Sequence, residues 1–146
     1  MFFLRELPTR MMIDRYVSAS GVGDTDTVAQ ALSMMREASQ LGRILDAYFS
    51  NYNLSQLKFH ILIVIDREPN TDSLRQSEIN QRLDVSKPVL HRTVASLLDE
   101  GFLVRNDDTQ DSRAHRLALT DAGKTMLAAI LPGYFETISD YMEKKP

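Results

Sequence analysis

The sequence predicts a mainly α-helical fold with one small β-hairpin, that is, an α+β protein. Apolar residues recur at three-and-four spacing over residues 25–52, which is the spacing of an amphipathic helix. Further along, two short helical stretches at 76–83 and 87–100 are separated by three residues, and two β-favouring stretches at 102–106 and 114–119 follow them. This order of helix, tight turn, helix and hairpin predicts a winged helix-turn-helix with further helices at both ends.

The composition is that of about one ordinary domain: the chain has 146 residues, of which 43% are hydrophobic. A net charge of −3 excludes a polycation that coats nucleic acid by charge alone. The absence of cysteine excludes disulfides, thiolate metal sites and a cysteine nucleophile. Apolar runs such as 61–65 are far shorter than the roughly 20 residues that cross a bilayer. The N-terminal residues do not form a secretory signal, so we expect no membrane segment and a cytoplasmic location.

Breaker residues place the boundaries of the other helices. Two glycines within the stretch 19–24 are expected to end a first helix formed by residues 7–17. A second, strongly apolar helix is expected over residues 56–67. The final helix contains Pro132 followed by Gly133, and this pair is expected to kink or split it.

The helix at 87–100 has two different faces. Its apolar residues recur at helical spacing and are expected to pack in the core. The opposite face, near the helix N-terminus, carries hydrogen-bond donors that are placed to enter the major groove of DNA. The residues expected on that exposed face are Ser86, Lys87, Pro88, His91 and Arg92.

The charge around this helix is only weakly positive. Residues 75–98 hold four cations against two carboxylates, a net charge of +2. In the hairpin three arginines are matched by three aspartates, and Asp107 and Asp108 are expected in a charged loop rather than in a cleft. Binding to nucleic acid must therefore depend on individually placed contacts, because there is no broad basic surface.

Five short motifs occur in register within residues 54–124 and together identify a family. Each motif is weak alone, but their order matches the expected order of the elements. The motifs are Gln76-Ser77-Glu78-Ile79 with Leu83, Val85-Ser86-Lys87-Pro88-Val89, Leu97-Leu98-Asp99-Glu100-Gly101-Phe102-Leu103-Val104-Arg105, Asp111-Ser112-Arg113-Ala114 and Leu119-Thr120-Asp121-Ala122-Gly123-Lys124. In this combination the chain resembles the MarR family of winged-helix transcriptional regulators.

The resemblance implies a homodimer that binds double-stranded DNA. Residues 1–146 would form a single domain, with a dimerisation part at 1–52 and 121–146 and a DNA-binding winged helix at 54–120. The implied function is that of a sequence-specific transcriptional regulator, a ligand-responsive repressor that binds a pseudo-palindromic operator.

The resemblance also implies contacts from the hairpin, or wing, to DNA. In the family, an arginine at the position of Arg113 enters the minor groove, and an aspartate at the position of Asp111 pairs with it to fix its direction. This fits the attraction of a guanidinium to a narrow, negative groove. Arg75 and the exposed residues of the helix at 87–100 complete the expected DNA-contacting set.

Two residues depart from the family pattern. Asn80 stands where a small residue, usually alanine, packs against the neighbouring helix. Asp84 stands in place of the usual turn glycine, and aspartate tolerates the left-handed backbone that such a turn needs.

An effector is a further implication of the resemblance. The family often binds small aromatic or phenolic anions in a crevice between the dimerisation and DNA-binding parts. The polar and aromatic candidates for lining it are Arg36, Arg43, Tyr48, Phe59 and His60. The same side chains are equally suited to the core and to contacts between subunits.

Other classes of function find less support in the sequence. No phosphate-binding loop, nucleophilic triad or zinc-protease motif occurs, so an enzyme is not expected, and neither is a cofactor. His60, His91 and His115 lack metal-ligand spacing, which predicts no metal site, although a metal-responsive regulator stays an alternative. The neutral wing and the acidic pI of 5.6 keep open a winged helix that binds another protein.

Overall fold

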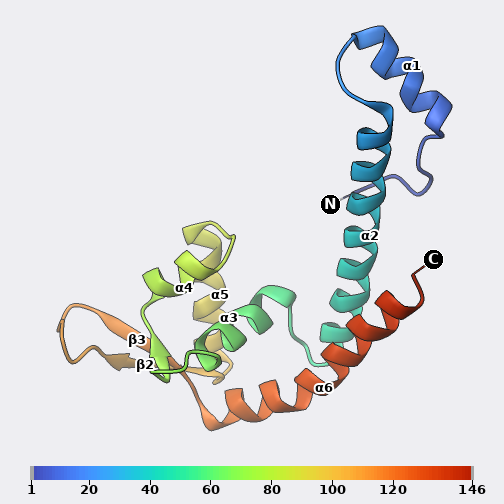
Figure 1. Cartoon of the computed structure of the whole chain (residues 1–146). Helices are drawn as coiled ribbons and strands as arrows, with labels where there is room; N and C mark the ends of the chain where they lie inside the picture. Colours follow the sequence, from blue (N-terminus) through green and yellow to red (C-terminus); the bar gives the residue numbers. More distant parts are fainter. Residues whose placement is uncertain (1, 146) are drawn as a thin grey trace. The chain divides into compact units, whose positions relative to one another are not determined.

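The computed structural model describes residues 2–145, and within this range it contains six helices and three short strands (Figure 1). No helix in this range is long and apolar enough to span a membrane. The elements are α1 (Arg10–Ser20), α2 (Thr25–Ser50), α3 (Gln56–Asp66), β1 (Ser73–Leu74), α4 (Gln76–Arg82), α5 (Lys87–Asp99), β2 (Leu103–Asp107), β3 (His115–Leu119) and α6 (Asp121–Glu143).

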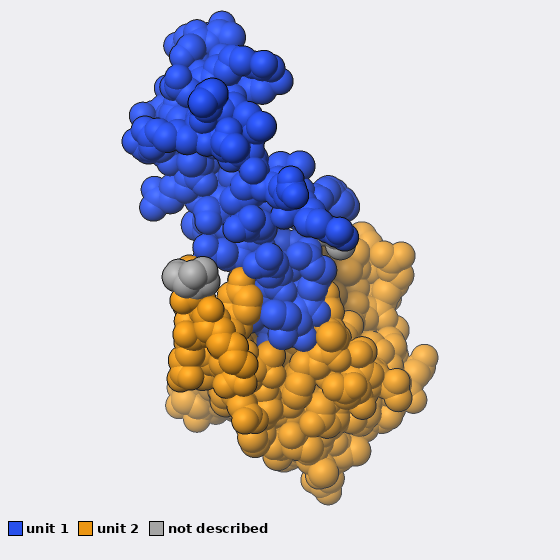
Figure 2. Space-filling model, turned by 90° about the vertical axis from the view of Figure 1, so that its right-hand side faces the viewer, with its two compact units in different colours: residues 1–45 blue, residues 46–146 orange. Residues whose placement is uncertain are grey.

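The chain divides into two compact units, residues 1–45 and 46–146 (Figure 2). Helix α2 begins in the first unit and its last turn belongs to the second. Helix α6 belongs to the same unit as the strands and α3 to α5. The division into a dimerisation part and a DNA-binding part is a functional one and stays a prediction.

In the first unit, capping side chains set the ends of α1 and the start of α2. The hydroxyl of Thr9 accepts a hydrogen bond from the backbone N–H of Met12, so α1 begins at Arg10 and not at residue 7. Gly21, in the left-handed conformation with φ of 68°, ends α1 three residues later than predicted. Asp24 accepts from the backbone N–H of Thr27 at 2.8 Å and begins the long helix α2.

The core of the second unit is built around α3, which is buried on several sides. Ser55 caps α3 by accepting from the N–H of Lys58, and the helix ends at Asp66, one residue earlier than predicted. The centroid of the Phe59 ring lies 4.7 Å from the ring centroids of Phe49 and of Tyr134. These aromatic contacts join α3 to α2 and to α6. The other fully or nearly fully buried residues of α3 are Ile61, Leu62, Val64 and Ile65.

Of the two outcomes predicted for Pro132 and Gly133, a kink or a split, the split does not occur: helix α6 is continuous through both residues and bends along its length (Figure 1). The hydroxyl of Tyr48 donates to the carbonyl of Ile130 at 2.6 Å, next to the proline. A Cβ on Gly133 would lie 2.4 Å from that hydroxyl oxygen. The glycine therefore makes room for a tyrosine that ties α2 to α6.

The three strands form one antiparallel sheet in the order β1-β3-β2. Strand β2 pairs with β3 from Leu103↔Leu119 to Asp107↔His115, which confirms the predicted hairpin. Strand β1 was not predicted, because two residues are too few to show the alternation that marks a strand. It pairs Ser73 with Ala118 and so attaches the hairpin to the segment that leads into α4.

A close backbone contact joins the hairpin to α6. Thr120 caps α6 by accepting from the N–H of Gly123 at 3.0 Å, and its own N–H donates to the carbonyl of Phe102 at 3.1 Å. A Cβ added to Gly123 would lie 2.2 Å from that carbonyl oxygen, closer than any non-bonded contact allows. The Thr-Asp-Ala-Gly motif thus has a structural reason.

We therefore expect Gly123→Ala to destabilise the fold by about 2 kcal/mol or more, because the backbone of Phe102 must move to admit the methyl group. Urea unfolding of the two proteins measures the difference. Gly42→Ala is the matched control: a Cβ at Gly42 meets nothing within 4 Å, so this variant should be as stable as the parent or more stable. Equal stability of the Gly123 variant and the parent would contradict the account.

Candidate nucleic-acid interface

The helix-turn-helix of α4 and α5 is set by local contacts at each helix start. The N–H of Arg75 donates to the carboxylate of Glu78 at 2.8 Å, which begins α4. Ser86 occupies the N-cap of α5 but its hydroxyl makes no capping bond, and Pro88 lies in the first turn. Among the described non-glycine residues only Asn53 has a positive φ, so the expectation that Asp84 adopts a left-handed turn is wrong.

The two faces of α5 are those that the sequence predicts. Leu90, Val94 and Leu97 are buried with at most 1% of their surface exposed. The residues that are expected on the opposite face of the helix are all exposed, namely Ser86, Lys87, Pro88, His91 and Arg92. Their contacts with nucleic acid stay a prediction, but the face that carries them is exposed.

Two of the four cations near this helix are already paired. Arg82 lies 2.7 Å from the carboxylate of Glu68 and also donates to the carbonyl of Glu78. Arg75 pairs with Asp108, and its side chain remains 35% exposed. Lys87 and Arg92 form no ion pair with a described residue. Two of the four cations, Lys87 and Arg92, are thus left without an ion pair among the described residues.

Asp108 is buried, so the expectation that it belongs to the solvated wing is wrong. Only 2% of its side-chain surface is exposed. Its carboxylate accepts from Nε of Arg75 at 2.8 Å, from Arg116 at 3.4 Å and from the backbone N–H of Gln110 at 2.8 Å. The carboxylate thus holds the wing loop against β3 and the start of α4.

Arg116 completes this network from β3. Its Nε donates to the hydroxyl of Ser73 at 2.8 Å, and another nitrogen donates to the Ser73 carbonyl at 2.6 Å. The hydrogen bond from Arg75 is the main reason why the pKa of Asp108 lies far below its ordinary value, and the N–H of Gln110 adds to the effect. Asp108 in turn raises the pKa of Arg75. Both partners are charged at neutral pH.

At the wing tip, the structure differs from the pairing that the family resemblance implied. Asp111 accepts a hydrogen bond from the backbone N–H of Arg113 at 3.0 Å, and not from its guanidinium. The Arg113 side chain is exposed and forms no ion pair with any described residue. Asp111 therefore shapes the turn, and the guanidinium of Arg113 is available for an anion.

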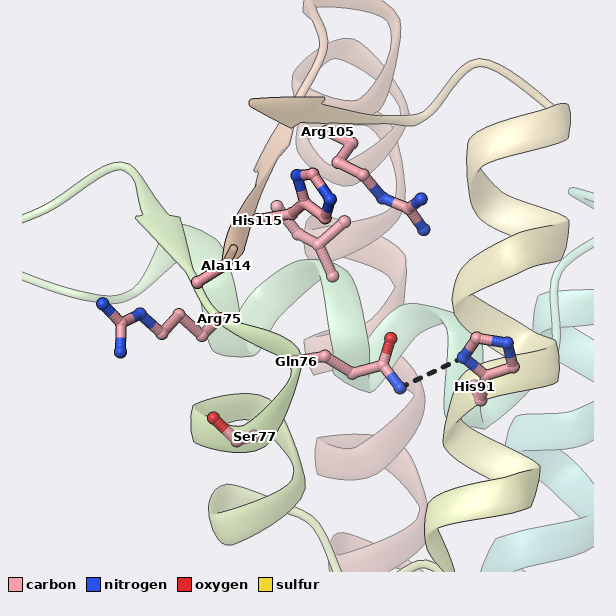
Figure 3. A pocket seen from close by; sticks show the side chains of 8 residues that line it. Arg75, Gln76, Ser77, His91, Arg105, Ala114 and His115 are labelled. Carbon is pink, nitrogen blue, oxygen red and sulfur yellow. Dashed lines mark hydrogen bonds between the residues drawn. The ribbon is translucent and has the colours of Figure 1, made fainter. Parts of the chain in front are cut away.

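A pocket of about 470 Å³ lies between α4, α5 and the wing (Figure 3). His91 of α5 and Gln76 of α4 face each other across 3.4 Å. The guanidinium of Arg105 lies on the side of the pocket near α5, whereas that of Arg75 points away from His91. The lining residues are Arg75, Gln76, Ser77, His91, Arg105, Ala114, His115 and Leu117.

Arg105 and His115 line this pocket, although the sequence analysis did not predict either of them as a site residue. The hairpin register could have found them: Arg105 is paired with Leu117, and side chains of paired residues lie on the same side of a sheet. His115 lies two residues before Leu117 and shares that side. One face of the hairpin is thus apolar at its base, where Leu103 is paired with Leu119, and polar toward its tip, where Asp107 is paired with His115.

The five residues expected to line an effector site do not gather in one pocket. Phe59 is 1% exposed and packs in the core, and the hydroxyl of Tyr48 is engaged with α6. Burial raises the pKa of Tyr48 to about 12, and burial lowers the pKa of His60. Arg36 and Arg43 belong to the other unit, where both line a pocket beside the N-terminal segment. No cluster of three or more metal-ligating side chains occurs among the described residues.

The comparison with known proteins agrees with this geometry. A sequence model described as the MarR family matches residues 52–114. The HTH-type transcriptional repressor YetL of Bacillus subtilis is 29% identical over 140 residues, which cover 96% of this chain and 83% of YetL. These matches in sequence support the assignment of the chain to the MarR family. Members named in these comparisons are transcriptional regulators or repressors.

Solved structures of MarR proteins share the fold. AbsC, a MarR family transcriptional regulator from Streptomyces coelicolor, has a TM-score of 0.74 at 18% identity and covers 82% of this chain, which covers 80% of AbsC. Sco3205 of the same organism, solved in complex with DNA, has a TM-score of 0.78 at 20% identity and covers 86% of this chain, which covers 79% of Sco3205. These matches confirm the mainly helical winged helix with its small antiparallel sheet.

Asp108→Asn should make the fold less stable at neutral pH and less sensitive to acid. Because the folded-state pKa of Asp108 is depressed, its carboxylate stabilises the fold above the ordinary aspartate pKa of about 4, and this contribution is lost as the pH falls toward the folded-state value. The free energy of unfolding in urea at pH 7 and pH 3 should therefore differ less in the variant than in the parent.

Asp107→Asn is the control for this measurement. Asp107 is the neighbouring residue, its side chain is 91% exposed, and the same charge is removed. This variant should keep the stability and the pH dependence of the parent. If the two variants behaved alike, the buried network would not be what holds the wing.

Proposed function

We propose that the protein is a sequence-specific transcriptional regulator that acts as a repressor. It is located in the cytoplasm and binds a pseudo-palindromic DNA site as a homodimer. The observation that carries the proposal is the pairing of cations. Arg75 and Arg116 are both paired with one buried carboxylate that fixes the wing, whereas Lys87, Arg92 and Arg113 are exposed. A fixed scaffold that presents unpaired cations suits a polyanion of regular shape.

In this proposal α5 enters the major groove, with Ser86, Lys87, Pro88, His91 and Arg92 facing the DNA. Arg113 enters the adjacent minor groove, and the exposed part of Arg75 contacts the strand between them. Because the cations are few, the affinity for DNA depends on each of them. The affinity falls as the salt concentration rises, because each contact with a phosphate releases counterions from the DNA. The protein acts by occupying a promoter, and not as an enzyme.

Exposed apolar side chains support the homodimer. In residues 2–45 Met11 is 83% exposed, and Tyr16 and Met34 are each 66% exposed. In α6, Phe135 and Met142 are more than half exposed. Such side chains are usually covered when they occur in number, and a second copy of the chain would supply an equal apolar surface around a two-fold axis.

The two subunits would place their α5 helices in successive major grooves, about one helical turn apart. A small effector would lower the affinity for DNA if it favoured a dimer in which this spacing no longer matches the two half-sites. A winged helix that binds another protein is the competing function, since Asp107 and Asp111 are also exposed at the wing.

Arg113→Ala should weaken binding to many DNA sequences by about 10-fold, and should reduce the slope of log affinity against log salt by about one unit. The measurement is a titration of the protein with its own promoter region and with random DNA over a salt series. Arg92→Ala should instead change the sequence preference or remove one phosphate contact.

Arg67→Ala is the matched control, because Arg67 is exposed at the end of α3 and belongs to no expected contact. It should bind DNA as the parent does. Equal binding by the parent to promoter and to random DNA, unchanged by Arg113→Ala, would contradict the proposal and favour a protein partner.

A further inference from the structure

The hydrogen-bonding role of His91 is not fixed by its residue type. Lys87 and Arg92, on the same exposed face of α5, can only donate hydrogen bonds. A neutral imidazole instead donates from one ring nitrogen and accepts at the other, and its surroundings decide which nitrogen carries the proton. The contacts of His91 within the chain therefore determine what it can offer to DNA.

Gln76 of α4 supplies the contact that fixes His91. Its side-chain nitrogen Nε2 lies 3.4 Å from Nδ1 of His91, and the other ring nitrogen points away from Gln76 (Figure 3). An amide nitrogen can donate a hydrogen bond but cannot accept one. Nδ1 must therefore be the acceptor in this pair, so the proton of a neutral His91 ring is on Nε2.

The start of α4 is itself held in place, which gives Gln76 a defined position. Gln76 directly follows Arg75, whose Nε lies 2.8 Å from the buried carboxylate of Asp108. Gln76 and His91 line the same pocket between α4, α5 and the wing, and His91 is exposed there. The buried network that fixes the wing is thus linked through α4 to the ring of His91.

We propose that Gln76 is a positioning residue for DNA recognition: it keeps Nε2 of His91 a donor, so that His91 reads a guanine in the major groove. Guanine presents two acceptors there, N7 and O6, whereas cytosine presents a donor. A face on which His91, Lys87 and Arg92 all donate is complementary to guanine and disfavours cytosine. The inference rests on the proposed function and adds to it the base that one residue of α5 recognises.

Loss of the Gln76 amide is expected to weaken the base preference and to leave the general affinity for DNA intact. Without a donor facing Nδ1, the ring proton can move to that nitrogen, and Nε2 can then accept a hydrogen bond from cytosine. Gln76 carries no charge, so the attraction to phosphates does not change. A residue that only held α4 against α5 would instead alter binding to all sequences alike.

The test is a measurement of base preference with the full-length protein. A preferred site is selected from a random pool of double-stranded DNA, and each guanine of the half-site is then exchanged in turn for cytosine. At one guanine the parent should lose affinity about 10-fold, because a hydrogen bond is lost and two donors face each other. At that position His91→Ala should abolish the preference. Gln76→Met, which keeps the length of the side chain, should reduce it to about 3-fold or less.

Gln81→Met is the matched control, because Gln81 is an exposed residue of the same helix and does not line the pocket. It should keep the base preference of the parent. The affinity for random DNA, measured at the same salt concentration, should be equal in the parent and in both glutamine variants. Circular dichroism establishes that each variant is folded, and Gln76→Ala takes the place of Gln76→Met if the latter does not fold.

Nitrogen NMR of the histidine rings tests the position of the proton without DNA. At about pH 8.5, where histidine is neutral, the signals of His91 in the parent should show a protonated Nε2 and an unprotonated Nδ1. The fraction with a protonated Nδ1 should rise in Gln76→Met. An unprotonated Nε2 in the parent, or the same distribution in both proteins, would overturn the inference whether or not the protein binds DNA.

Two results with DNA would also overturn the inference and leave the proposed function intact. One is a guanine preference that is equal in Gln76→Met and in the parent. The other is a selected site at which no guanine depends on His91. Failure to select any site would overturn the proposed function as well, so the two failures are distinguishable.

Discussion

The wing depends on one buried carboxylate. Asp108 takes hydrogen bonds from two arginines and from the backbone of its own loop, and through Arg116 and Ser73 it also reaches β1. A buried charge is costly unless it is paired and fully hydrogen-bonded, and here both conditions are met. The loop between β2 and β3 is therefore attached to the start of α4, and the position of the wing is fixed relative to the helix-turn-helix.

This arrangement separates structural cations from available ones. Arg75, Arg82 and Arg116 hold elements of the unit together by pairing with carboxylates, whereas Arg92, Arg105 and Arg113 form no ion pair with any described residue. The chain as a whole carries a net charge of −3. An anion is thus attracted by a few oriented guanidinium groups on a rigid frame, and not by the overall field of the molecule.

The sequence predicts the fold well because periodicity and capping are local. The two faces of α5 follow from the spacing of Leu90, Val94 and Leu97, and the hairpin follows from its alternating residues. The sequence does not predict that Asp108 is buried while Asp107 is exposed, since both are aspartates in a polar loop. Asp108 differs from Asp107 because Arg75 and Arg116 both donate hydrogen bonds to its carboxylate. These two arginines are distant from one another in the sequence, so only the fold brings them together. The contact of Gln76 with His91 likewise depends on how α4 packs against α5.

A hydroxyl-radical footprint of the protein on its own promoter region tests the central claim most directly, because it reports both the DNA contact and its symmetry. Two winged helices on one two-fold axis predict two equivalent protected patches, with centres about one helical turn of roughly 10 base pairs apart. A single protected patch would contradict the symmetric dimer. Protection no stronger than on random DNA would contradict sequence-specific binding itself.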